Sequence, residues 1–247
     1  MSGIQQMMMA SHAPAGGAPF GGLVSTANLV EWWPLDEASG TRVGVHAGLD
    51  LTDNNTVTGN PGVGSSTASQ FTRANNEFLS RASSAALQTG DIAFTACKWV
   101  YLDSKPAAGY STLLGKNDYS ASQYEWSIMH QTSIDRFLFS GCSDGVTNFG
   151  TCVANSFGAP SLSTWHFVVC WHDPVANTMN IQINDGSVDS LSWTAGLFSG
   201  TGDFTIGEQK GLSRQLDGRG QRAGFWKRIL TAGEKTALFN SGNGLDY

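Results

Sequence analysis

The most informative stretch for the fold is residues 218–247, GRGQRAGFWKRILTAGEKTALFNSGNGLDY. Residues 223–228, AGFWKR, place a phenylalanine and a tryptophan next to each other, which predicts a β-strand. Thr231 then opens a short helix, and the glycines at 242 and 244 stop it. An aromatic strand held by one following helical turn is typical of the closing segment of a β-sandwich.

The rest of the chain has the composition of an all-β protein. Only 14% of the 247 residues are charged and 30 are glycine, while Ser, Thr and Asn fill the gaps between short apolar runs. Residues 178–184 alternate apolar and polar side chains, and Asp185-Gly186 after them predicts a hairpin turn. Pro34 favours an edge position for the first strand. Strands are predicted at 29–35, 68–72, 77–80, 92–102, 112–116, 124–130, 136–140, 151–155, 165–172, 178–184, 187–191, 204–207 and 223–228. Short strands in this number predict a sandwich of two sheets.

Residues 1–28 differ from the rest, because they are rich in Gly, Ala, Pro, Ser and Met and show no apolar periodicity. This composition predicts an extended arm at 1–28 and one domain at 29–247. Such an arm becomes ordered only through buried contacts that offset its lost entropy, so we expect it to dock on neighbouring subunits. The residues expected to make these contacts are Ile4, Met7, Met8, Met9 and Phe20.

Charge and hydropathy argue against two classes of partner. The net charge is −6 and the 14 Lys and Arg residues are scattered, which argues against nucleic acid. No apolar run approaches the roughly 18 residues that span a bilayer, so no membrane insertion is expected. The N-terminus lacks the basic segment and long apolar core of a secretion signal, so none is expected either.

Four stretches carry a resemblance to a known family: LVEWWPLDEASGTRV (29–43), DIAFTACKWVYLD (91–103), STWHFVVCWHDPVANTMNIQINDG (163–186) and GFWKRILTAGEKTALFNSGNGLDY (224–247). Over residues 28–247 the chain resembles the concanavalin A-like, laminin-G-like jelly-roll domains, in their bacterial and phage branch. The resemblance implies an all-β, two-sheet antiparallel jelly-roll sandwich with an extended N-terminal arm and a short C-terminal helix. It implies less about function, because this fold hosts lectins, glycanases and adhesive modules.

The sequence offers no convincing catalytic group. Retaining glycosidases of this fold carry an E-x-D-x-x-E strand, which places two carboxylates about 5–5.5 Å apart. The nearest equivalents here are Glu31, Asp36 and Glu37, and the first two would face opposite sides of a strand. No G-x-S-x-G nucleophile motif occurs either. We therefore expect no catalytic residue and no enzymatic activity.

Metal and sulfur sites are weakly indicated. Related domains often carry an acidic pair just before the GFW strand, where this chain has Gly220, Gln221 and Arg222 and so lacks oxygen ligands for Ca²⁺. The remaining calcium candidates are the side chains of the DLTDNN loop, Asp50, Asp53 and Asn54. No other cofactor is expected. Cys142 and Cys152 flank a glycine-containing loop, and the sequence leaves open whether they form a disulfide.

Aromatic side chains are the remaining signal for binding. Eight tryptophans is a high count, and most lie in apolar strands where a core position is expected. The candidates for surface platforms that stack on sugar rings are Trp32, Tyr119, Trp126 and Trp193.

These observations lead to one main prediction and two alternatives. The start MSGIQ and the arm resemble the N-termini of phage virion proteins, which predicts a virion structural protein in capsid decoration or a head or tail fibre. Residues 2–28 would then contact other virion proteins or copies of the chain in an oligomer, and the jelly roll would face outward toward host or environmental glycans. The first alternative is a secreted or surface-displayed bacterial lectin-like module, found outside the cell rather than in a virion. The second, a glycan hydrolase, is disfavoured by the missing acidic triad.

Overall fold

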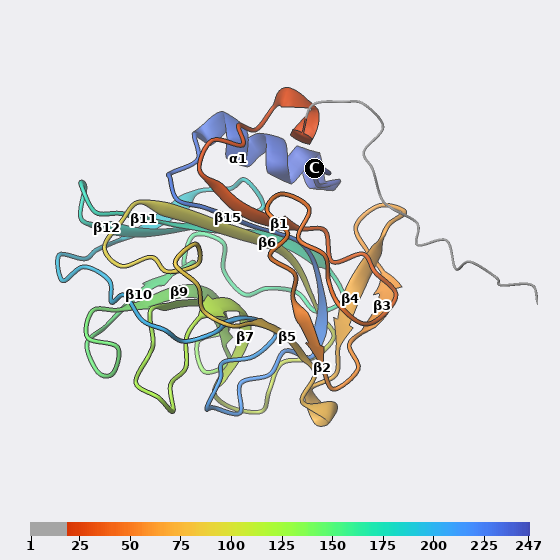
Figure 1. Ribbon diagram of the computed structural model, residues 1–247, viewed down its shortest axis with the longest axis horizontal. Helices are drawn as coiled ribbons and strands as arrows, with labels where there is room; N and C mark the ends of the chain where they lie inside the picture. The colour runs from red at the N-terminus through yellow and green to blue at the C-terminus, as the bar shows by residue number, and fades with distance from the viewer. Residues whose placement is uncertain (1–18) are drawn as a thin grey trace, which may run out of the picture.

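Two antiparallel β-sheets lie face to face in a sandwich, and a short helix covers the outer side of one of them (Figure 1). The computed structural model describes residues 19–247. The predicted all-β, two-sheet sandwich of the concanavalin A-like type with a C-terminal helix is confirmed. Ile4, Met7, Met8 and Met9 of the expected arm lie outside the described residues.

The eight-stranded sheet has the order β13-β12-β11-β6-β15-β4-β3, and β1 also pairs with β15. Because β15 is the longer strand, it pairs with β4 at its start and with β1 at its end. The predicted edge position of the first strand agrees with this pairing. The strands are β1 (Leu29–Trp33), β3 (Thr58–Pro61), β4 (Thr67–Phe71), β6 (Phe94–Leu102), β11 (Trp165–Asp173), β12 (Thr178–Ile183), β13 (Val188–Ser192) and β15 (Gly218–Trp226).

The seven-stranded sheet has the order β10-β9-β8-β7-β14-β5-β2. Its strands are β2 (Thr52–Asn54), β5 (Phe78–Arg81), β7 (Tyr110–Lys116), β8 (Trp126–Gln131), β9 (Arg136–Cys142), β10 (Phe149–Val153) and β14 (Phe204–Ile206). The helical segments are α1 (Ala232–Phe239) and the 3-10 turns η1 (Pro19–Gly22), η2 (Arg73–Asn75) and η3 (Asn240–Gly242).

Strand alternation sorts the apolar side chains into two clusters. On β6, Phe94, Ala96 and Val100 point between the sheets, and the residues between them, Cys97 and Trp99, point to the outer side. The inner cluster fills the sandwich. The outer cluster lies between the eight-stranded sheet and α1, so both faces of this sheet are buried.

The N-terminal part of the described chain belongs to the outer cluster. Phe20 is fully buried, with its ring 5.0 Å from Trp32 and 5.1 Å from Tyr247. Val24 is buried in the same cluster. The prediction that Phe20 docks on another subunit is therefore wrong, because its own domain encloses the ring.

Helix α1 begins as the sequence indicates. The Thr231 side chain accepts from the backbone N–H of Glu234, and the Glu234 carboxylate accepts from the N–H of Thr231. This capping box satisfies two free N–H groups at the start of the helix. The Glu234 carboxylate also pairs with Arg228 and accepts from the N–H of Ser25, so one side chain ties the helix, the end of β15 and the N-terminal segment together.

Strand β15 is longer than predicted because polar residues extend it. Gly218 and Gly220 pair with both β4 and β6, which apolar patterning does not reveal. The ladder to β6 shifts register between Gln221 and Gly224, where Arg222 has a φ of 49°. This bulge turns the strand from pairing with β4 to pairing with β1. The polar strands β2 and β3 were likewise not predicted.

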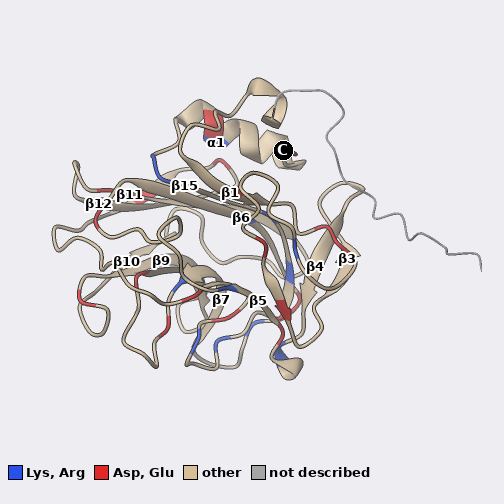
Figure 2. Ribbon diagram, viewed as in Figure 1, with Lys and Arg blue, Asp and Glu red and all other residues tan. Residues whose placement is uncertain are grey.

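Charge is distributed without a basic stripe over the described residues (Figure 2). Across residues 19–247, no helix has both the length and the apolar character needed to cross a membrane.

Candidate functional site

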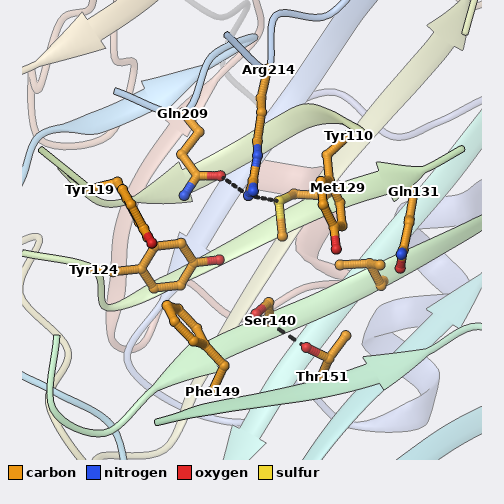
Figure 3. Close-up of a pocket in the computed structure, with 11 residues that line it drawn as sticks. Tyr110, Tyr119, Tyr124, Met129, Gln131, Ser140, Phe149, Thr151, Gln209 and Arg214 are labelled. Atoms are coloured by element: carbon orange, nitrogen blue, oxygen red, sulfur yellow. Dashed lines mark hydrogen bonds between the residues drawn. The ribbon is translucent and has the colours of Figure 1, made fainter. Parts of the chain in front are cut away.

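The outer side of the seven-stranded sheet carries a pocket of about 360 Å³ (Figure 3). Alternate residues of β8, β9 and β10 point into it, because the residues between them point into the core. Two loops complete the walls, one before β8 and one between β14 and β15. The lining residues are Tyr110, Tyr119, Tyr124, Met129, Gln131, Leu138, Ser140, Phe149, Thr151, Gln209 and Arg214.

Aromatic rings form much of the pocket wall. Tyr119 and Phe149 are 43% and 38% exposed, so each ring offers an accessible edge or face. Phe149 lies edge-on to Tyr124, with ring centroids 5.0 Å apart. Rings of this kind supply large, rigid apolar surfaces against which a flat ligand packs.

Arg214 is the charged member of the lining. Its guanidinium lies 4.2 Å from the centroid of the Tyr110 ring, in a cation–π contact. Its Nη1 donates to Gln209 Oε1 at 2.7 Å and lies 3.9 Å from Met129 Sδ. The side chain is half-buried, and these contacts fix the orientation of the guanidinium plane.

Two polar groups of the pocket wall are buried behind its surface. Gln209 is 0% exposed and Tyr124 is 1% exposed. Gln209 Nε2 makes no hydrogen bond among the described residues, and the Tyr124 hydroxyl faces the hydroxyls of Ser127 and Ser140. Burial raises the pKa of Tyr124, so the hydroxyl keeps its proton. Both groups therefore belong to the wall of the pocket and are not open contact points for a ligand.

The loop that carries Gln209 and Arg214 is braced by backbone hydrogen bonds. Gln209 and Leu212 form an isolated bridge around Gly211, whose φ of 84° suits a tight turn. The N–H of Thr112 on β7 donates to Arg214 O at 2.8 Å. Both pocket-lining side chains of this loop are therefore held against the sheet.

The Tyr119 loop is tied to the same turn. The N–H of Tyr119 donates to Lys210 O at 3.0 Å, and Lys210 Nζ pairs with Asp203 at 2.8 Å and with Asp118 at 3.3 Å. The hydrogen bond to Asp203 is the main reason that the pKa of Lys210 is raised. The two loops thus form one connected rim.

Of the four predicted stacking residues, only Tyr119 reaches this pocket. Trp126 is 0% exposed and fills the core between Phe94 and Phe225, so its prediction as a surface platform is wrong. Trp32 is 1% exposed and belongs to the outer cluster under α1. It lines a separate pocket of about 450 Å³, but its ring face is not accessible to a ligand. Trp193 is half-buried, and its indole Nε1 donates to Gly196 O at 2.7 Å.

The calcium candidates are engaged in the structure of their own loop. Asp50 accepts from the N–H of Gly44, and Asp53 accepts from the N–H groups of Gly40 and Val57. Asn54 donates to Ser80 Oγ. Between residues 19 and 247, no group of three or more His, Cys, Asp and Glu side chains is placed to hold a metal ion. These contacts are those of an ordinary turn, in which side-chain oxygens cap backbone N–H groups.

The nearest carboxylates to a catalytic set also have structural roles. Glu31 is fully buried, and its carboxylate accepts from the N–H groups of His46, Ala47 and Leu49. Gln221 and Arg222, which replace the acidic pair of related domains, bond to Val63 and Asp246 respectively.

All four cysteines are free thiols. In the ladder between β9 and β10, Cys142 lies opposite Phe149 and Cys152 lies opposite Phe139. The question that the sequence left open is settled by this register, because the two cysteines are not paired across the strands.

Several pocket residues were missed by the sequence analysis. Tyr110, Tyr124 and Phe149 lie in or beside predicted strands, but alternation alone does not tell which face of a sheet becomes the core. Gln209 and Arg214 lie in a loop far along the chain from β8–β10. The only local signal is a tyrosine at the start of each of two strands, which is also typical of ordinary strands.

Comparison with known proteins places the fold. The binding domain of Paraclostridial Mosquitocidal Protein 1 superposes with a TM-score of 0.70 at 16% identity, covering 87% of this chain and 52% of that one. The binding domain of botulinum neurotoxin DC in complex with SialylT gives 0.62 at 14% identity, covering 87% and 51%. The chain thus spans about half the length of these toxin domains.

A third solved structure matches over nearly its whole length. Domain 4 of AbnA, an extracellular arabinanase from Geobacillus stearothermophilus, in complex with arabinotriose, gives a TM-score of 0.62 at 15% identity, covering 85% of this chain and 97% of that one. No curated protein matches the sequence at a significant level. The sequence model of one family matches residues 73–234, well over half of the chain. The chain therefore belongs to the concanavalin A-like lectin/glucanases superfamily.

Proposed function

We propose that the protein is a glycan-binding, lectin-like module whose ligand occupies the pocket on the seven-stranded sheet. The observation that carries the proposal is the combination of exposed aromatic rings with the polar side chains of Gln131 and Arg214 in one pocket. Sugars present both an apolar ring face and hydroxyls, and this pocket offers a surface for each. Two structural neighbours that are in complex with sugar ligands, arabinotriose and SialylT, support this choice.

The role we propose is binding without hydrolysis. Glycoside hydrolysis in its usual form needs two carboxyl groups across the scissile bond. The residues that line the pocket include neither Asp nor Glu. The tyrosine hydroxyls, amides and single arginine of the lining suit recognition rather than acid–base chemistry on a glycosidic bond.

The proposed setting is outside the producing cell, as a secreted or surface-displayed module. A virion structural protein, in capsid decoration or a fibre, is the second candidate, and the resemblance of the N-terminal sequence MSGIQ to phage virion proteins favours it. Immunogold electron microscopy with an antibody to residues 29–247 separates the two. Regular labelling of particles supports the virion, whereas labelled cell surfaces beside bare particles contradict it.

Binding is tested with the full chain on a glycan array that spans plant, bacterial and animal sugars. We expect a defined group of glycans to bind, and Tyr119→Ala and Phe149→Ala each to weaken that binding about tenfold, because an aromatic contact is worth roughly 0.5–1.5 kcal/mol beyond the area that it buries. Leu162→Ala is the matched control, because Leu162 is also exposed but does not line the pocket.

Two results contradict the proposal. One is an array on which no glycan binds the folded chain. The other is a bound glycan whose affinity is the same for wild type, Tyr119→Ala and Phe149→Ala, because the ligand would then occupy another surface.

A further inference from the structure

We propose that Arg214 forms a carboxylate subsite, so that the preferred ligand of the pocket is an acidic sugar, such as a uronic or sialic acid. This inference rests on the proposed function and specifies its ligand class. Three features of the molecule support it: the environment of the Arg214 guanidinium, the accessible polar side chains of the same pocket and the net charge of the whole chain.

Arg214 is a half-buried charge without an acidic partner. It is the only charged residue in the pocket lining, and no Asp or Glu of residues 19–247 lies within ion-pair distance of it. Arg222 and Arg228, by contrast, pair with Asp246 and Glu234 at 2.8 and 2.6 Å. A partly desolvated guanidinium is stabilised by an anion, and an open pocket lets the ligand supply it.

The guanidinium is oriented in advance for such a ligand. Tyr110 lies against one face, and Gln209 Oε1 accepts from Nη1. Among the described residues, Nε and Nη2 have no hydrogen-bond partner. Arginine nitrogens present a planar fork that matches the two oxygens of a carboxylate. The free nitrogens of Arg214 therefore suit a carboxylate in the pocket (Figure 3).

Groups for a sugar hydroxyl lie next to this fork. Gln209 Oε1 holds Arg214 in place from the buried side of the pocket wall. The accessible polar groups of the same pocket are the Tyr119 side chain, which is 43% exposed, and the half-buried Gln131 side chain (Figure 3). A ligand that carries a carboxylate and hydroxyls on one ring can contact the Arg214 fork and these side chains together, and an acidic sugar is such a ligand.

General electrostatics does not explain an affinity for acidic glycans here. The chain carries a net charge of −6, so its overall field repels polyanions. Any preference for acidic sugars must therefore come from a local contact, and Arg214 is the cation in the pocket. Rising salt should weaken the preference by screening that contact.

The test uses isothermal titration calorimetry on the full chain with trigalacturonic acid, trimannuronic acid and 3′-sialyllactose, each beside its carboxyl methyl ester. We expect at least one acid to bind and its ester to bind about tenfold or more weakly, the scale of one charge-assisted hydrogen bond. Arg214→Gln should remove that difference by weakening only the acid, while Arg214→Lys should retain part of it. Arg219→Gln is the matched control, because Arg219 also lies over a tyrosine, Tyr101 at 4.4 Å, but outside the pocket.

The outcomes separate this inference from the function on which it rests. If neutral glycans bind and Tyr119→Ala weakens them, but no acid is preferred over its ester, glycan binding stands and the carboxylate subsite is wrong. If an acid is preferred and Arg214→Gln leaves that preference unchanged, the subsite lies elsewhere and the inference is also wrong. If no glycan binds in calorimetry or on the array, the proposed function and the carboxylate subsite are both wrong.

Discussion

The two sheets differ most on their outer sides. On the eight-stranded sheet, Trp99 stacks on Phe239 at 5.8 Å, and α1 and the N-terminal segment cover this face. On the seven-stranded sheet, no described segment covers Tyr119 and Phe149, and the face is hollowed into a pocket. Both faces carry aromatic side chains. An aromatic strand residue therefore becomes core or accessible surface according to whether another segment of the chain covers it.

The largest expected effect comes from removing an aromatic ring on the covered face. Trp226 is fully buried against Phe20 and Trp32, so Trp226→Ala should lower the free energy of unfolding by about 3–5 kcal/mol through lost burial and a residual cavity. Urea unfolding followed by fluorescence measures this change. A loss below about 1 kcal/mol would show that the cluster under α1 contributes little to stability.

A second prediction concerns the core between the two faces. Lys98 lies inside the sandwich, where its Nζ donates to Leu113 O and burial lowers its pKa to about 7. Lys98→Met should raise the free energy of unfolding at pH 7 by roughly 1–4 kcal/mol, because an apolar side chain of similar length replaces a buried amine that has one hydrogen bond and no acidic partner. Thermal and urea unfolding measure the gain.

The same residue gives a pH dependence with a definite sign. Between about pH 7 and 10.5 the unfolded chain holds a proton on Lys98 that the folded chain has released, so this group makes the folded state more stable as pH rises. The advantage of Lys98→Met should therefore shrink by about 2 kcal/mol from pH 7 to pH 9. An advantage that does not change with pH would contradict a lowered pKa at Lys98.

A smaller effect is expected at the attachment of the covering helix. Hydrogen bonds from Arg228 hold the pKa of Glu234 down to about 2, and the carboxylate also caps α1. Glu234→Gln should cost about 1–2 kcal/mol at pH 7, the scale of a lost cap with one ion pair. Because the folded pKa is lowered, this contribution is present above about pH 4.5 and is lost as pH falls through about 2.

The measurement is urea unfolding of wild type and Glu234→Gln at pH 7 and pH 3. Asp246→Asn serves as a control, since Asp246 also pairs with an arginine but its side chain is 80% exposed. We expect that control to change stability by less than about 1 kcal/mol. Equal losses in the two variants would mean that Glu234 acts as an ordinary surface ion pair.

The smallest effect on stability is expected on the open face. Tyr119→Ala should change the free energy of unfolding by only about 0.5 kcal/mol, because the ring packs against little of the chain. The same variant should lose glycan affinity. An aromatic ring on the covered face should therefore matter mainly for stability, and a ring on the open face mainly for binding. A large loss of stability in Tyr119→Ala would show that Tyr119 is a structural residue. It would contradict the contrast between the covered and the open face.

Much of the fold was predictable because it follows from local patterning. The alternation in β12, the Asp185-Gly186 turn and the Thr231 start of α1 each report a conformation that nearby residues impose. The short polar strands β2 and β3 were not predicted, since only pairing with neighbours makes them strands. The candidate site was predicted at Tyr119 alone, because its other members come from distant strands and loops.

Local sequence patterns were enough to predict the all-β class, the two-sheet sandwich and the closing strand with its helix, because the 2-residue strand period and the capping residues act over short distances. Which aromatic residues face solvent depends on long-range packing. Trp32 and Trp126 look no different from Tyr119 in sequence, yet the first two are buried by segments that return from elsewhere in the chain. Tertiary packing likewise brought Arg214 to Tyr110 and left it without an acidic partner, a juxtaposition across about a hundred residues that no local pattern encodes.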